Sequence, residues 1–214
     1  MSSAARTILV TGFEPFGGET VNASWEATQK LEGWRHGDTV AVARLLPCAY
    51  ESSVKKLISA IETLRPDALL MAGQAARRAV VCVERFAHNL DDATAPDNDG
   101  ALRRALRISR AAPEWLETMA PVRTIARAIK EAGIPARVSR DAGGFVCNHL
   151  YFGALQYLSD KRSAIPAVFV HLPVTPEQAP RGVNEKRLTP TEAADALRAA
   201  AAAILDELKA GEAA

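Results

Sequence analysis

Residues 39–73, TVAVARLLPCAYESSVKKLISAIETLRPDALLMAG, contain a complete strand–helix–strand pattern. The apolar run Thr39–Leu46 predicts a strand that ends at Pro47, and Ala68–Ala72 predicts a second strand closed by Gly73. Between them, apolar side chains recur every three or four residues, which predicts an amphipathic helix over Tyr50–Leu64. A strand–helix–strand unit of this kind is typical of parallel strands in one sheet, so this stretch indicates an α/β fold.

The same alternation continues on both sides of this unit. Further strands are predicted over Thr7–Thr11, Val80–Leu90, Ala136–Ser139 and Ala167–Leu172. Further helices are predicted over Val122–Ile129, from just after the glycine pair Gly143–Gly144 through Leu158, and from the capping box Thr189–Glu192 to Gly211. Strands that alternate with helices imply a mostly parallel, twisted sheet covered on both faces, a three-layer α/β/α architecture. No repeat or linker divides the chain, so residues 1–214 are predicted to form a single domain.

Composition excludes several classes of function. With 214 residues, 48% of them hydrophobic, the chain can bury one sizeable core. A formal net charge of +1 gives no electrostatic reason to expect nucleic acid or an anionic membrane as a partner. The segment Met1–Arg6 lacks the long apolar stretch of a signal peptide, and no segment approaches a membrane span. Three cysteines without CxxC spacing indicate reduced thiols and a cytoplasmic location.

The stretch Ser139–His149, SRDAGGFVCNH, carries the strongest chemical signal. A loop of small residues delivers Cys147 to the first turn of a predicted helix, where the positive end of the helix dipole favours a thiolate. His171 emerges at the end of a predicted strand and can complete a nucleophile–base pair if the fold brings the two together. This is the outline of an enzyme with a cysteine nucleophile.

Simpler interpretations of these residues stay open. Cysteine is among the most buried residue types, and Cys48 and Cys82, without such a setting, are expected only to pack. His171 alone would more often be a structural histidine. His149 is the weaker candidate base, because positions i and i+2 of a helix point in different directions. A zinc site made of Cys147, His149 and His171 has a poor ligand pattern.

The carboxylate of Glu84 and the acidic cluster in residues 91–99 can each be interpreted as functional or as structural. Glu84 stands among apolar residues, where it would either orient the imidazole of a Cys-His-acid arrangement or simply face solvent or pair with Arg85. The acidic residues of the segment 91–99 would bind a cation or, as their spacing favours, form Asx turns and caps.

The loop Gly12–Gly18, GFEPFGG, follows the first predicted strand and matches neither GxGxxG nor GxxxxGK[ST]. Its two phenylalanines, Phe13 and Phe16, would serve as a hydrophobic staple or as a platform for a flat apolar ligand.

Several segments, in order along nearly the whole chain, carry a family resemblance. They are Thr11–Gly18 with Asn22 and Ser24–Glu26, Gly73–Ala75, Glu84–Asn89, Asp92–Ala93, Pro96–Gly100, Ala142–Gly143, Phe145–Asn148, His171–Pro173 and Pro176–Gln178. With them the chain resembles pyroglutamyl-peptidase I, the pyrrolidone-carboxylate peptidases, a family of cytosolic cysteine peptidases with a single α/β/α domain.

The resemblance implies an exopeptidase that removes N-terminal pyroglutamyl (5-oxoproline) residues from peptides through a thioester, without a cofactor. Cys147 would be the nucleophile, His171 the general base and acid, and Glu84 the residue that holds the imidazole. The family commonly assembles as a homotetramer, so a homo-oligomer, tetramer or dimer, is expected. The implied substrate-binding residues, around a slot for the flat ring, are Phe13, Phe16, Gln74, Phe145 and Val146.

Several residues differ from the family pattern, and these differences keep a second hypothesis about the function open. Thr94 stands where the family has an arginine thought to support the oxyanion, Cys82 replaces a usual Ser or Thr, and Asp141 places an anion where it would raise the pKa of the thiol. The alternative is therefore a triad-bearing homologue with weak or no peptidase activity that binds pyroglutamyl groups or another small ligand. A phosphate- or nucleoside-binding enzyme would use the Gly17–Gly18 loop, which offers Glu14 and Glu19 but no basic residue.

Overall fold

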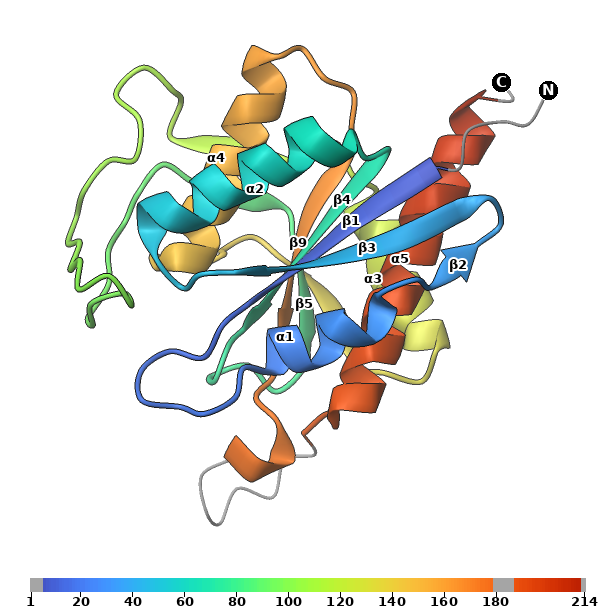
Figure 1. Cartoon of the computed structure of the whole chain (residues 1–214), viewed down its shortest axis with the longest axis horizontal. Helices are drawn as coiled ribbons and strands as arrows, with labels where there is room; N and C mark the ends of the chain where they lie inside the picture. Colours follow the sequence, from blue (N-terminus) through green and yellow to red (C-terminus); the bar gives the residue numbers. More distant parts are fainter. Residues whose placement is uncertain (1–5, 179–186, 213–214) are drawn as a thin grey trace.

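Within the described residues, a seven-stranded sheet runs through the centre of the molecule and helices cover both of its faces (Figure 1). The computed structural model describes residues 6–178 and 187–212. Of the segment Met1–Arg6, it therefore includes only Arg6. In spatial order the strands of the sheet are β2 (Arg35–His36), β3 (Thr39–Leu46), β1 (Arg6–Phe13), β4 (Ala68–Gln74), β9 (Ala167–Leu172), β5 (Val81–Glu84) and β8 (Ala136–Ser139).

The prediction of a mostly parallel sheet is confirmed. The strands β3, β1, β4 and β9 are parallel neighbours, and β5 and β8 are parallel to each other. Two pairings are antiparallel: β2 with β3, and β5 with β9.

The prediction of one strand over Val80–Leu90 is wrong. The chain divides at Arg85: β5 stays in the central sheet, whereas β6 (Phe86–His88) leaves it and pairs with β7 (Trp115–Glu117) in a separate two-stranded sheet. The N–H of Arg85 still bonds to the carbonyl of Ser139, while its own carbonyl accepts from Thr118, so this residue links the two sheets.

The helices form one layer on each face of the sheet. On one face lie α2 (Tyr50–Leu64) and α4 (Val146–Asp160), and on the other α1 (Ala23–Thr28), α3 (Val122–Glu131) and α5 (Pro190–Glu212). Short 3₁₀ helices span Gln29–Leu31 and Pro176–Gln178. The predicted capping box is present, since Glu192 N–H donates to Thr189 Oγ1 at 3.2 Å and Thr189 N–H donates to Glu192 Oε2 at 2.9 Å. None of the helices in the described part of the chain has the length and apolar character needed to cross a membrane.

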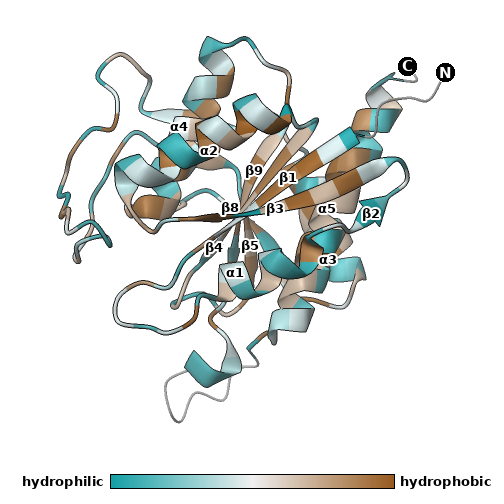
Figure 2. Ribbon diagram, in the orientation of Figure 1, coloured by the Kyte–Doolittle hydropathy of each residue, from teal (hydrophilic) through white to brown (hydrophobic). Residues whose placement is uncertain are grey.

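The period-two alternation of the strands decides which side chains face α4. Met71 and Phe169 pack in the core formed with α2 and α4, so Gly73 and His171, two residues further along the same strands, lie on that face as well. Glu84 follows a side chain of the opposite core and therefore also faces α4. Figure 2 shows the hydrophobic residues concentrated along the central strands, whereas the helices carry both hydrophobic and hydrophilic residues. The sheet thus carries the candidate residues on the face that α4 covers.

Candidate active site

A cavity of about 360 Å³ lies where β1, β4 and β9 end and α4 begins. Carboxyl ends of parallel strands beside a helix N-terminus are a common place for a ligand site in α/β proteins. The lining residues are Phe13, Phe16, Asn22, Cys48, Gln74, Ala75, Ala76, Arg77, Arg78, Ala142, Gly143, Gly144, Phe145, Cys147 and His171.

Cys147 is the second residue of α4, in the first turn as the sequence predicted, and its side chain is half-buried. No side chain caps this helix: Phe145 at the N-cap makes no side-chain bond, and its carbonyl accepts from His149 N–H. The N–H groups of the residues before His149 therefore lack intrahelical acceptors and are available to an anion beside Cys147.

The glycine pair before α4 has a steric cause. Gly143 has a φ of +85°, which favours glycine. Asp92 N–H donates to Gly144 O at 2.8 Å, and a Cβ on Gly144 would lie 2.6 Å from the backbone oxygen of Asp92. The loop that delivers Cys147 is thus held close against the segment after β6, where only a glycine fits.

His171 is bonded to the acid that the resemblance implied. Its Nδ1 lies 2.8 Å from Glu84 Oε1, and both side chains are buried. A carboxylate at Nδ1 holds the proton on that nitrogen and leaves Nε2 as the acceptor. In the sheet, His171 is in register with Gly73, and a Cβ on Gly73 would lie 2.8 Å from Cys147 Sγ. The thiol and the imidazole therefore occupy neighbouring positions over the same part of the sheet and line the same cavity.

Burial has the largest effect on the pKa of both Cys147 and His171. It raises the pKa of Cys147 to about 12, with a further increase from the Glu84 carboxylate, whereas Arg78 and a backbone N–H lower it. Burial likewise lowers the pKa of His171, partly offset by the bond to Glu84. A backbone N–H thus lowers the pKa of Cys147, the direction predicted for a helix start, but burial acts in the opposite direction and is the larger effect. A thiol beside an imidazole can pass its proton to the ring as it attacks a substrate.

Asp141 does not act on the thiol as predicted from the sequence. Its Oδ1 accepts from Gly143 N–H at 2.8 Å, which forms a turn before the helix. The groups that shift the pKa of Cys147 are burial, Glu84, Arg78 and the backbone, while Asp141 raises the pKa of His171 instead.

Of the five substrate-binding residues named from the resemblance, four line the cavity. Val146 does not, because its side chain is fully buried in the core beneath α4. Gln74 has one amide atom already engaged: its Oε1 accepts from Ala23 N–H at 2.7 Å, which leaves Nε2 to face a ligand. The rings of Phe16 and Phe145 lie 5.8 Å apart, and Phe13 is almost fully buried.

Other features of the cavity had weak signals or none in the sequence. Cys48 lines the cavity besides packing in the core, and Arg78 contacts Glu84 directly. The sequence signal that could have indicated Arg78 was its position four residues after Gln74, where the strand ends. Thr94, by contrast, is exposed and does not line the cavity.

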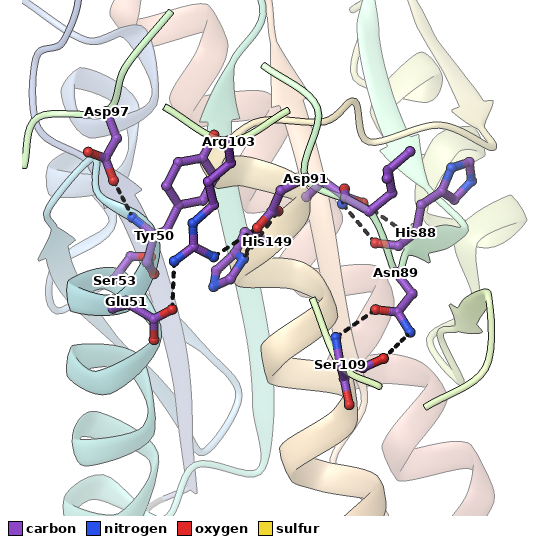
Figure 3. Close-up of polar contacts among 12 residues, drawn as sticks. Tyr50, Glu51, Ser53, His88, Asn89, Asp91, Asp97, Arg103, Ser109 and His149 are labelled. Atoms are coloured by element: carbon purple, nitrogen blue, oxygen red, sulfur yellow. Dashed lines mark hydrogen bonds and ion pairs between the residues drawn. The ribbon is translucent and has the colours of Figure 1, made fainter. Parts of the chain in front are cut away.

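His149 belongs to a separate network, buried at His149 and Asp91 and exposed at Glu51, which Figure 3 shows. Its Nδ1 bonds to Asp91 at 2.9 Å, Asp91 pairs with Arg103 at 2.9 Å, and Arg103 reaches Glu51 on α2 at 2.7 Å. The ring of His149 also packs edge-on against Tyr50, with centroids 5.2 Å apart. His149 thus anchors α4 to α2 and to the loop after β6, and it does not line the cavity.

The acidic segment after β6 forms turns and caps, as its spacing favoured. Asp97 Oδ1 accepts from the N–H groups of Asp99 and Ala101, and its Oδ2 accepts from Tyr50 N–H at the start of α2. Among residues 6–178 and 187–212, no group of three or more His, Cys, Asp and Glu side chains is arranged to hold a metal ion.

Comparison with known proteins gives a consistent result. A profile of the family described as pyroglutamyl peptidase matches residues 6–207. The chain is 41% identical over 201 residues to the pyrrolidone-carboxylate peptidase of Cupriavidus necator, which covers 94% of this chain and 93% of the relative. The crystal structure of pyroglutamyl peptidase I from Bacillus amyloliquefaciens is similar with a TM-score of 0.90 and 38% identity, covering 94% of this chain and 97% of that one. A mutant pyrrolidone carboxyl peptidase from Pyrococcus furiosus gives a TM-score of 0.89 at 31% identity, covering 94% and 99%.

Proposed function

The chain belongs to the pyroglutamyl peptidase family, and from this premise we propose that Cys147, His171 and Glu84 remove N-terminal pyroglutamyl residues from peptides. It is accordingly a cysteine peptidase of the pyroglutamyl-peptidase I type. The observation that carries the assignment of residues is the bond of 2.8 Å between His171 Nδ1 and Glu84 Oε1, beside a cavity that Cys147 also lines.

The reaction proceeds in two acyl-transfer steps. His171 Nε2 takes the proton of Cys147 as Sγ attacks the acyl carbon attached to the lactam ring, and N–H groups at the start of α4 stabilise the oxyanion. The peptide C–N bond then breaks, and His171 gives the proton to the leaving amine. Water, deprotonated by His171, hydrolyses the thioester, which releases pyroglutamate and returns the thiol.

The cavity suits a small, flat, neutral ring. Phe13, Phe16 and Phe145 offer apolar surface, and Gln74 Nε2 donates to the lactam carbonyl. An open-chain N-terminal residue, glutamate included, carries a free ammonium group, which would enter this apolar surface as an unpaired charge, and that is costly. The slot therefore selects the cyclised residue against its open-chain counterparts.

Three broader features belong to the same proposal. Residues 1–214 form a single domain, supported by the central sheet, which contains β1–β5 from the first half of the chain together with β8 and β9 from the second. The protein acts without a cofactor in the cytoplasm, in line with its reduced cysteines. It assembles as a homotetramer or dimer, which sedimentation equilibrium of the purified chain tests.

The activity is tested with pyroglutamyl-7-amino-4-methylcoumarin, beside glutaminyl-7-amino-4-methylcoumarin as the open-chain control. The expected result is release of the fluorophore from the first compound, undiminished by a chelator, and far slower release from the second. No turnover of the cyclic substrate at any enzyme concentration would favour the alternative of a binding protein, and calorimetric binding of free pyroglutamate would support it.

Phe16→Ala is expected to raise KM for the pyroglutamyl substrate by about threefold to tenfold, the effect of one lost aromatic contact. Phe16 is only half-buried, so the free energy of unfolding should fall by about 1 kcal/mol. Phe13→Ala is the contrasting variant: Phe13 is 2% exposed, and its loss should cost about 3–5 kcal/mol. A large stability loss with unchanged KM for Phe16→Ala would instead identify this ring as a staple of its loop.

A further inference from the structure

Arg78 makes a cluster of hydrogen bonds around the carboxylate that also bonds to His171. Its Nη1 donates to Glu84 Oε1 at 2.6 Å and to Ser139 Oγ at 3.1 Å, and its Nη2 donates to Asp141 O at 2.5 Å. The oxygen of Glu84 that accepts from Arg78 is the same one that accepts from His171. The other oxygen, Oε2, is buried and has no partner among the described residues.

The charge of Glu84 requires such a partner. Its side chain is 0% exposed, and a buried carboxylate without a cation is strongly destabilised or takes up a proton. The ionisable groups around His171 are Glu84 and Cys82 on β5, Asp141 before α4, Cys147 on α4 and Arg78. Arg78 is the fixed cation among them, and it lowers the pKa of both His171 and Cys147.

The same guanidinium joins three segments that are distant in the sequence. It extends from the loop after β4, reaches Glu84 at the end of β5, and bonds to Ser139 and Asp141 on the path from β8 to α4. That path leads directly to Cys147. Arg78 therefore holds both Glu84, which bonds to the imidazole of His171, and the loop that carries Cys147.

We propose that Arg78 is a positioning residue of the peptidase, which fixes Glu84 Oε1 under His171 and ties the Cys147 loop to that pair. The proposal rests on the proposed function and extends the triad to a fourth, cationic member. Arg78 itself lines the cavity, but its Nη1 and Nη2 already donate to Glu84, Ser139 and Asp141, so it acts through Glu84.

The test begins with Arg78→Gln, assayed for kcat and KM between about pH 5 and pH 9 with the coumarin substrate. Without the cation, the Glu84–His171 pair binds a proton at higher pH, on whichever group, and the acid limb of kcat/KM should move up by about one pH unit or more. At the optimum, kcat should fall by about tenfold to a hundredfold with KM nearly unchanged, because a displaced imidazole is out of line with the thiol. Arg137→Gln, which removes an exposed arginine of β8, is the matched control and should match the wild type.

Arg78→Lys keeps the charge but not the forked geometry, so it should keep the wild-type acid limb while recovering only part of kcat. A second comparison is made in the Glu84→Gln background, where Arg78→Gln leaves no buried charge unpaired and folding is protected. If Arg78 acts through Glu84, adding Arg78→Gln to Glu84→Gln should cause no further loss of kcat.

An unshifted acid limb in folded Arg78→Gln would overturn the proposal, and so would a further loss of about tenfold or more in the Glu84→Gln background. Either result would make Arg78 a structural residue only. Failure of the proposed function itself is distinguishable, because the wild type and Arg137→Gln would then also lack turnover.

Discussion

Cys147→Ala is expected to abolish hydrolysis of the pyroglutamyl substrate, with a loss in kcat on the order of 10⁶-fold, or about 8 kcal/mol of transition-state stabilisation. No other cysteine can take over, because Cys48 and Cys82 are 3% and 0% exposed and neither stands at the start of α4. The fold should be unchanged, since Cys147 lies at the cavity and alanine suits the first turn of a helix. Turnover and thermal unfolding of the purified variant, measured side by side, check both statements.

The partners of Cys147 should form a graded series. His171→Ala removes the base of a thiol whose pKa burial raises to about 12, so it should cost nearly as much as the loss of the nucleophile. Glu84→Gln should retain more activity than either, with a loss on the order of 10⁴-fold, since an orienting group is worth less than the groups it serves.

Alkylation supplies a readout that does not depend on turnover. Iodoacetamide at neutral pH should label Cys147 faster than Cys48 or Cys82, in parallel with the loss of activity. In His171→Ala the labelling of Cys147 should slow, because the neutral thiol has no base beside it. Full activity of Cys147→Ser, or equal labelling of the three thiols, would remove the assignment of the nucleophile.

Gly73→Ala should inactivate the enzyme by about a hundredfold or more, although Gly73 takes no part in the chemistry. A Cβ at this position would lie 2.8 Å from Cys147 Sγ and 2.7 Å from Phe169 Cζ, and Phe169 is fully buried. Since the sheet and the core cannot yield, the thiol must move, and displacement of a reacting atom by about 1 Å costs about a hundredfold. Overpacking should also lower the free energy of unfolding by about 1–3 kcal/mol.

Two further variants separate the causes of this loss. Gly211→Ala adds a Cβ that meets nothing within 4 Å, so it should leave activity and stability unharmed. Phe169→Leu, which lacks the two ring atoms that the new Cβ would meet, should restore part of the stability of Gly73→Ala without its activity. If Gly73→Ala turns over at the wild-type rate, the thiol does not occupy the position described here.

The sequence predicted correctly those elements that depend on local patterns, and it failed where an element depends on a partner far away in the chain. The strands Thr39–Leu46 and Ala167–Leu172 and the helix Tyr50–Leu64 are confirmed at both ends, because their apolar periodicity and their terminating residues are local. The stretch Val80–Leu90 was misjudged because its second half pairs with Trp115–Glu117, a partner that no local pattern shows. Val146 was placed at the cavity through the resemblance, yet the rotation of α4 turns its side chain into the core.

Short-range pattern and motif order were enough to predict the α/β class, the mostly parallel sheet, the placement of Cys147 in the first turn of a helix, and the family. Which groups meet depends on contacts between distant segments and is seen only in the folded chain: Glu84 Oε1 bonds to both His171 and Arg78, Gly73 lies against the thiol, and His149 joins a network apart from the cavity. The tertiary structure also decided a second influence on the thiol. The helix start favours a thiolate at Cys147, whereas burial among packed neighbours raises the pKa of the thiol and is the largest of the effects on it.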